Sequence, residues 1–220
     1  TVAATAGHRA VHVALGTSSD VVARWHGRTR VGAAERLARS TREVRALLGG
    51  ERVDGFRLRE PPAGSTVTVA AFGPRATEIA RDADRMVLNM VTADTAAELA
   101  PQHPNTAVWL AAAIDPTPDE RRWMALGFVG YLGAPGYGEM FARAGFADLV
   151  AFARTRPHPR EIADRLPDEL LDAVALTGDE ATVRRRIDEY ADAGVREIGL
   201  VMPPLDLAAG PRTLELLAPC

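Results

Sequence analysis

Short apolar runs alternate with helical patterns along this 220-residue chain, and this alternation most constrains its fold. Each run is nearly continuous in Val, Ile, Leu or Ala, as in parallel strands that are covered on both faces. Helices must connect such strands, so the pattern predicts an α/β fold. Five strands are predicted, over residues 10–16, 66–71, 85–90, 106–114 and 197–202.

The segments between these runs carry helical periodicity and termination signals. Residues 33–48 place apolar side chains on one face and stop at Gly49-Gly50, and residues 180–193 do the same before Gly194. Residues 50–65, rich in Gly and Pro, are predicted to form a loop or short hairpin excursion. Further helices are predicted over residues 75–82, 95–99, 119–132 and 137–144.

Five strands are too few to close a β/α barrel, which needs eight. An open sheet of this kind would expose apolar edges and a buried face. We therefore expect residues 1–220 to be a single partial (β/α)8 TIM-barrel domain, running from roughly strand 4 to the C-terminus. The first three units, on the order of 100 residues, would precede residue 1. A naturally short open α/β fold is the alternative.

Composition removes several classes of function. A net charge of −3 does not favour nucleic acid or an anionic membrane, and no apolar stretch approaches the ~20 residues of a membrane span. All 26 basic residues are Arg, which excludes a lysine nucleophile and, with the abundant Ala, suggests an actinobacterial genome. The lone Cys220 suggests a reducing, cytoplasmic location. No His, Cys, Asp and Glu spacing fits a metal site.

The turn after residues 66–71 is the clearest candidate binding site. Phe72, Gly73, Pro74 and Arg75 join a buried strand to a helix N-terminus, where free N–H groups and the helix dipole favour a phosphate. Arg75 would be a charge partner for that phosphate. The alternative is an ordinary turn in which Gly73 only supplies a positive φ.

Two other strand ends carry polar groups where barrel active sites lie. Asn89, Met90, Val91 and Thr92 end the run at 85–90, and Asn89 or Thr92 would add hydrogen bonds to the same phosphate. Thr92 is equally suited to capping the next helix. Thr17, Ser18 and Ser19 follow the run at 10–16, where their small hydroxyl side chains let a flat ring approach. Turn formation with Asp20 is the alternative.

Trp25 and His26 are candidates for the wall of a substrate pocket. A Trp supplies apolar surface, and a His titrates near neutral pH and can pass a proton. The sequence assigns no catalytic residue, and His26 is the candidate acid or base. The alternative is that Trp25 packs on its own loop and that His26 binds backbone groups.

Four stretches in this order resemble the luciferase-like monooxygenase superfamily, in particular its coenzyme F420-dependent oxidoreductases. They are Ala14–Ser19 with Trp25–Arg28, Val69–Arg75 with Val87–Asn89, Pro135–Tyr137 with Ala144–Phe146, and Leu176–Glu180 with Ala193–Val195. The chain departs from the family in two places. The family's usual Leu-Ser-Gly-Gly-Arg is here Ala6-Gly7-His8-Arg9. The family's common Ser-His-Pro is here Ser18-Ser19-Asp20, so the loop after residue 16 lacks the His that would contact the ring of a flavin-type cofactor.

The resemblance implies a (β/α)8 barrel that binds F420, or alternatively FMN, at the C-terminal ends of its strands. It implies hydride transfer between F420 and a small organic substrate, and commonly a homodimer. The residues named above at the three strand ends would then contact the cofactor, with Gly73 holding its phosphate. The alternatives are an FMN-dependent luciferase-like monooxygenase and a non-catalytic flavin-binding or structural protein, because a fold does not fix a function.

Overall fold

A computed structural model describes residues 9–204 and 206–218 of the chain. These residues form two compact units, which are described separately. The first unit holds the chain up to Leu88 together with Gln102–Thr106, and the second holds Asn89–Pro101 and the chain from Ala107 onward. Cys220 and residues 6–8 lie outside the described residues. Whether the two units belong to a single barrel domain stays a prediction.

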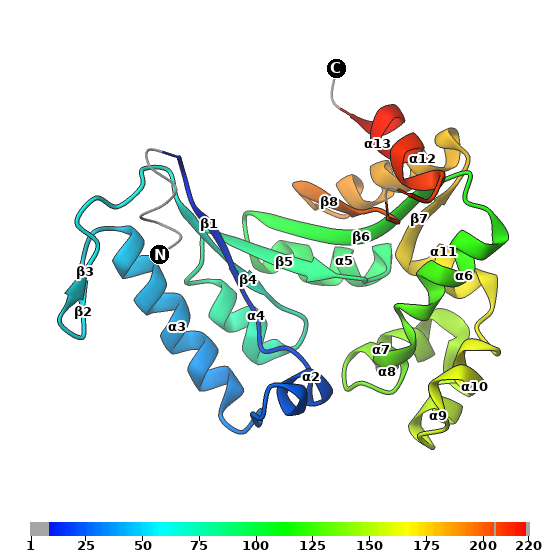
Figure 1. Cartoon of the computed structure of the whole chain (residues 1–220), viewed down its shortest axis with the longest axis horizontal. Helices are drawn as coiled ribbons and strands as arrows, with labels where there is room; N and C mark the ends of the chain where they lie inside the picture. The colour runs from blue at the N-terminus through cyan, green and yellow to red at the C-terminus, as the bar shows by residue number, and fades with distance from the viewer. Residues whose placement is uncertain (1–8, 205, 219–220) are drawn as a thin grey trace. The chain divides into compact units, whose positions relative to one another are not determined.

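The first unit is a parallel sheet with helices against it. Strand β4 lies between β1 and β5 and is parallel to both, and the helices α3 and α4 pack against β4 (Figure 1). Val67, Val69 and Met86 are fully buried. The elements are β1 (His12–Leu15), α2 (Asp20–Trp25), α3 (Ala33–Leu48), β2 (Arg52–Val53), β3 (Phe56–Arg57), β4 (Thr66–Ala70), α4 (Pro74–Ala80) and β5 (Arg85–Asn89), whose last residue begins the second unit.

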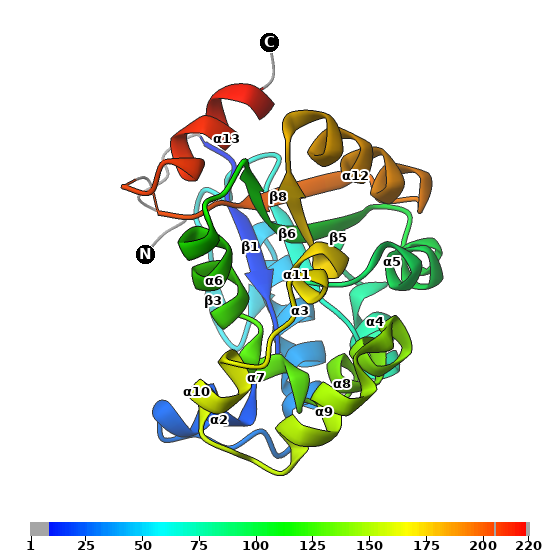
Figure 2. The same cartoon turned by 90° about the vertical axis from the view of Figure 1, so that its right-hand side faces the viewer.

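The second unit is built on β6, which is parallel to β7 along its C-terminal half and to β8 along its N-terminal half. Helix α12 lies beside both β7 and α5 (Figure 2). The elements are α5 (Ala93–Leu99), η1 (Ala100–Gln102), β6 (Thr106–Ile114), α6 (Pro118–Leu126), α7 (Val129–Leu132), α8 (Tyr137–Phe141), the π-helical turn η2 (Ala142–Phe146), α9 (Ala147–Arg154), α10 (Pro159–Ala163), α11 (Asp168–Val174), β7 (Ala175–Gly178), α12 (Glu180–Asp192), β8 (Glu197–Val201) and α13 (Ala209–Leu217).

All five predicted strands are present, with bounds within two residues of those expected. The hairpin excursion is also confirmed, as β2 and β3. A sixth parallel strand, β7, was not predicted. It has only four residues and follows the apolar end of α11 without a break, so periodicity does not separate the two elements. Within each unit the fold is α/β with parallel strands, as a segment of a β/α barrel requires; which barrel strands are present stays a prediction.

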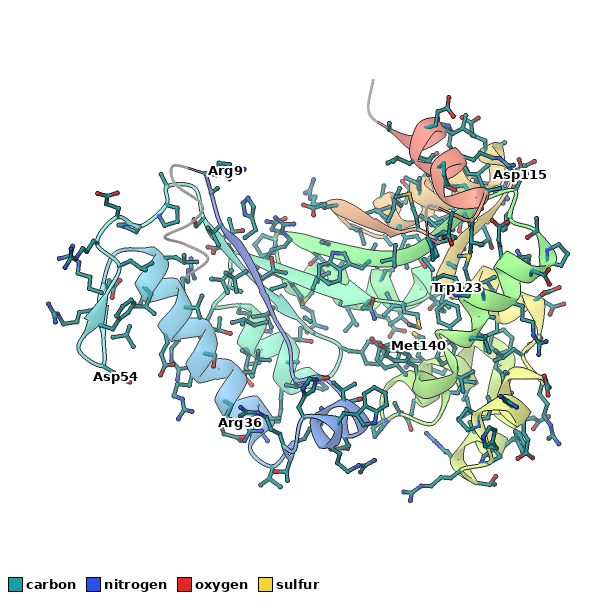
Figure 3. All side chains as sticks on the ribbon, viewed as in Figure 1. Arg9, Arg36, Asp54, Asp115, Trp123 and Met140 are labelled. Carbon is teal, nitrogen blue, oxygen red and sulfur yellow. The ribbon has the colours of Figure 1, made fainter. Side chains whose placement is uncertain are left out.

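The helix predicted over residues 119–132 is two helices, because α6 ends at Gly127 before α7 begins. The stop at Gly145 is confirmed, since its φ of 99° is left-handed, but the chain continues directly into α9. Within residues 123–146, several large apolar side chains are buried and others are exposed: Met124, Phe128, Leu132, Met140 and Phe141 lie in the core, whereas Trp123 and Leu126 are exposed. Figure 3 shows Met140, which is 1% exposed, and Trp123, which is 49% exposed.

Candidate functional site

The C-terminal ends of β1 and β4 lie side by side in the first unit. Leu15 pairs with Val69 in a parallel register, and a β-carbon built on Gly16 would lie 3.2 Å from the Ala70 Cβ. Parallel neighbours end at the same edge of a sheet. The structure therefore brings two groups of predicted cofactor-binding residues to one edge, Thr17–Ser19 and Phe72–Arg75.

The turn at Gly73 has room for a ligand. Gly73 has φ −88° and ψ 163°, so the interpretation that glycine is needed there for a positive φ is wrong. No heavy atom beyond its chain neighbours lies within 4 Å of a β-carbon built on it, and no side chain caps α4. Pro74 has no N–H, and the N–H groups of Arg75 and Ala76 have no acceptor within the helix. Open space and available donors fit a phosphate.

Arg75 already has a partner. Its Nη2 donates to the Glu35 Oε1 at 2.5 Å, and both side chains are largely exposed. A hydrogen bond from the Glu35 backbone N–H, and then the Arg75 guanidinium, hold the pKa of Glu35 below its usual value. Exposed ion pairs contribute little to stability and are screened by salt. Contact between Arg75 and a phosphate therefore stays a prediction that requires Arg75 to exchange Glu35 for the ligand.

The hydroxyls after β1 also serve local structure. Ser19 Oγ accepts from the Val22 N–H at 3.3 Å and caps α2. Thr17 Oγ1 accepts from Arg30 Nη2 at 3.3 Å, and Arg30 also lies 3.7 Å from Asp20. Ser18 is exposed and has a left-handed φ of 56°. This segment thus leads into α2 and is capped by Ser19, and its contact with a cofactor stays a prediction.

Trp25 and His26 lie at the end of α2. The Trp25 side chain is 77% exposed, which does not fit packing on its own loop. His26 is exposed and terminates α2, with its backbone N–H directed at the carbonyls of Val22 and Ala23. The roles of both residues at a substrate pocket stay predictions.

In the second unit, the segment Asn89–Thr92 is held by two tyrosines. Tyr137 donates its hydroxyl to the Asn89 carbonyl at 2.9 Å, and Tyr190 donates to the Val91 carbonyl at 2.6 Å. Met90 between them has a left-handed φ of 53°. Such a backbone costs of order 1–3 kcal/mol and persists only where its surroundings fix it. The two phenols, from α8 and α12, therefore fix this turn.

Thr92 begins α5 as its N-cap and accepts from the Thr95 N–H at 3.2 Å, so the capping role is confirmed. The tyrosine contacts were not predicted. Tyr137 stands in the motif Pro135-Gly136-Tyr137 and Tyr190 on the apolar face of its helix. Neither pattern reveals a hydroxyl partner in another element. The one available signal was chemical, because a buried Tyr needs an acceptor for its O–H.

Replacing Tyr190 with Phe should destabilise the protein by about 1–3 kcal/mol, because the buried Val91 carbonyl loses its donor. Burial raises the pKa of Tyr190 to about 12, so the loss should be the same from pH 6 to pH 9. Urea unfolding measures it. Tyr131→Phe is the control, since that ring packs edge-on against Tyr137 at 5.0 Å and its hydroxyl donates to no described residue. Equal losses in both variants would contradict the assignment.

Two surface hollows of the first unit lie away from these strand ends. One is on the β2–β3 hairpin, and the other is lined by residues such as Arg45, Ser65 and Asp84, at the N-terminal ends of β4 and β5. Among the described residues, no group of three or more His, Cys, Asp or Glu side chains could hold a metal ion. Within the same residues, no helix has the length and apolarity that crossing a membrane requires.

No protein-family model matches the chain, and no curated protein matches it significantly. Solved structures do match. A coenzyme F420-dependent tetrahydromethanopterin reductase from Methanopyrus kandleri aligns over 96% of this chain and 73% of its own, with a TM-score of 0.69 and 15% identity. An F420-dependent secondary alcohol dehydrogenase, in complex with an F420–acetone adduct, aligns over 93% and 68%, with a TM-score of 0.65 and 14% identity.

An EDTA monooxygenase from Chelativorans sp. BNC1 aligns over 98% of this chain and 65% of its own, with a TM-score of 0.52 and 15% identity. All three proteins are members of the luciferase-like monooxygenase superfamily. The resemblance indicated by the sequence is therefore confirmed at the level of the fold. The three matched proteins are named as a reductase, a dehydrogenase and a monooxygenase, all of which are oxidoreductases.

Proposed function

We propose that this chain belongs to an oxidoreductase that transfers a hydride between coenzyme F420 and a small organic substrate. The observation that carries the proposal is the fold likeness to two F420-dependent enzymes, over 96% and 93% of the chain. Their TM-scores, 0.69 and 0.65, exceed the 0.52 of the EDTA monooxygenase. The deazaflavin would supply the hydride chemistry, and the protein would bind it, orient it and exclude water.

The strand ends support a cofactor there. The described chain has five non-glycine residues with positive φ, and three of them, Ser18, Met90 and Asp115, closely follow the C-terminal ends of β1, β5 and β6. Strained backbone of this kind gathers at ligand-binding sites. In the first unit, we propose that the N–H groups after Gly73 bind the cofactor phosphate and that Thr17–Ser19 contact its ring or side chain.

In the second unit, we propose that Asn89–Thr92 also contacts the cofactor. Trp25 and His26 would contact the substrate, with His26 as the candidate proton donor or acceptor. A homodimer is the expected assembly. An FMN-dependent monooxygenase is the second candidate, favoured by the likeness to the EDTA monooxygenase.

Titration of the purified protein with F420 and with FMN tests the proposal, using the fluorescence of each cofactor as the readout. We expect saturable binding of F420 that is at least tenfold tighter than that of FMN. Tighter binding of FMN would replace the proposal with the monooxygenase. Failure to bind either cofactor would support a non-catalytic protein.

A further inference from the structure

Trp109 is exposed in the middle of a strand whose other residues are covered. The structure describes all nine residues of β6, and among them only Trp109, at 38%, is classed as exposed. Its neighbours Val108 and Leu110 project from the opposite face of the strand and are fully buried. One face of β6 is therefore packed against the rest of the protein, and the other is accessible at Trp109.

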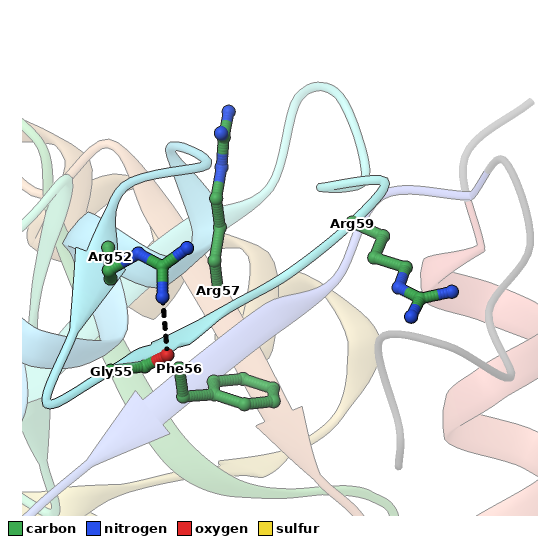
Figure 4. A pocket seen from close by; sticks show the side chains of 5 residues that line it. All are labelled: Arg52, Gly55, Phe56, Arg57 and Arg59. Atoms are coloured by element: carbon green, nitrogen blue, oxygen red, sulfur yellow. Dashed lines mark hydrogen bonds between the residues drawn. The ribbon is translucent and has the colours of Figure 1, made fainter.

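This exposure differs from that of an aromatic side chain on a small element. Phe56 is 58% exposed on a hairpin strand of only two residues (Figure 4), which offers little surface for packing. Trp109 instead has a strand on each side of it. On the accessible face, Val201 of β8, which pairs with Ala111, is also 56% exposed. An indole left open beside a second apolar side chain in the middle of a sheet indicates a surface that a ligand covers.

Gly199 provides the space that the indole occupies. Trp109 is paired with Gly199 of β8, and a β-carbon built on Gly199 would lie 2.5 Å from the Trp109 Cδ1 and 3.0 Å from its Nε1. A side chain at position 199 would therefore displace the indole. The glycine lets the ring lie close to the backbone of β8, so that the position of the indole is set by the sheet itself.

Asn89 stands on the other side of Trp109. The Met90 N–H donates to the Trp109 carbonyl at 3.0 Å, and in a parallel pair this bond places Asn89 opposite Trp109. Paired residues project from the same face of a sheet. The half-buried Asn89 and the indole are thus neighbours on one face, and the Tyr137 hydroxyl holds the Asn89 carbonyl at 2.9 Å.

The chemistry of this pair identifies a class of ligand. An indole packs favourably against another flat aromatic system, and a carboxamide offers two N–H donors and one oxygen acceptor. Together they suit a planar heteroaromatic ring whose edge carries both a carbonyl and an N–H group. The rings of a deazaflavin and of a flavin both have such an edge.

We propose that Trp109 packs against the ring of the redox cofactor and that the Asn89 carboxamide binds the polar edge of the ring. This inference rests on the proposed function and deepens it, because Asn89 already belongs to the segment proposed above to contact the cofactor. It adds a residue, Trp109, that determines affinity for the ring rather than for the phosphate.

Fluorescence titration of three variants with F420 tests the role of the indole. W109A should bind at least tenfold more weakly than the parent, whereas W109F keeps a flat ring and should bind within threefold of it. G199A should weaken binding as W109A does, because its β-carbon displaces the indole. The double variant W109A/G199A should then bind no more weakly than W109A, since both changes act through the same ring. Thermal unfolding shows that each variant is folded.

The control is W123F, which changes another exposed tryptophan of the second unit, on α6. It should bind F420 like the parent. If the parent binds F420 or FMN and W109A binds it equally well, this inference is wrong and the proposed function stands. If the parent binds neither cofactor, the proposed function fails, and the inference fails with it.

A second measurement distinguishes a ligand from a protein partner on this face. W25F/W123F leaves Trp109 as the single tryptophan of the chain. Acrylamide should quench its emission in the free protein and quench it much less when F420 is bound at saturation. Protection already present in the free protein would mean that a second copy or another segment covers the face, and it would overturn the proposal. Equal quenching with and without the cofactor would do the same.

Discussion

Gly73→Asp should reduce cofactor affinity about 100-fold or more without destabilising the protein. At the N-cap, with φ −88° and ψ 163°, Asp is a preferred residue and accepts from the first-turn N–H groups. Its carboxylate would thus occupy the donors proposed for the phosphate. The carboxylate and the phosphate are both negative, and two like unit charges about 4 Å apart near a surface repel each other by roughly 4 kcal/mol. Cofactor titration by fluorescence measures the affinity, and thermal unfolding measures the stability.

Two further substitutions separate the causes of such a loss. Gly73→Asn caps the helix in the same way without a charge, so it should weaken binding much less than Asp. Gly73→Ala adds only a β-carbon, which has no neighbour within 4 Å, and should retain most of the affinity. If the parent binds F420 or FMN and the Asp variant binds it equally well, the phosphate does not lie at Gly73. If the parent binds neither, the proposed function itself fails.

The parallel strands could be predicted because each is a short, nearly continuous apolar run between helical patterns. Strand β7 could not, since its apolar residues continue those of α11. Helices α2, α9, α10, α11 and α13 were also missed. The prediction ended the helical segment at Gly145, but the chain turns there through a left-handed residue and resumes as α9. Periodicity locates an element only where its ends differ from their surroundings.

The candidate site was predictable in position and not in its contacts. Strand ends and capping residues are local features, so the role of Thr92 as an N-cap could be read from the sequence. The pairing of Arg75 with Glu35 joins residues 40 positions apart, and the hydroxyl of Tyr190 reaches a carbonyl 99 positions away. Side-chain periodicity carries no information about such partners. The exposure of Trp25 was equally unavailable, because it depends on what packs around α2.

Glu120 should be the carboxylate on which stability depends most. It is 4% exposed, and its Oε1 accepts from the Ala209 N–H at 2.8 Å, at the start of α13. Its Oε2 accepts from the Thr117 N–H at 2.7 Å and from the Thr117 hydroxyl at 2.9 Å. Glu120→Ala leaves the buried Ala209 N–H without an acceptor, whereas Thr117 is exposed and its donors can bind water. The loss should be about 1–3 kcal/mol, which urea unfolding at pH 7 measures.

The pH dependence gives a sharper test of Glu120. Hydrogen bonds from the backbone of Ala209, and then of Thr117, lower the pKa of this carboxyl below its usual value of 4.5. Its contribution is therefore complete above pH 4.5 and is lost as pH falls through the lowered pKa. Glu120→Gln cannot ionise, so its loss of unfolding free energy relative to the parent should be constant from pH 8 to about pH 5 and shrink at lower pH.

Glu215→Gln is the control. Glu215 lies exposed on α13, and its carboxylate forms no hydrogen bond or ion pair with the described residues. This variant should lose little unfolding free energy at any pH. A deficit of Glu120→Gln that stayed constant down to pH 3 would mean that the charge of Glu120 does not hold α13 in place.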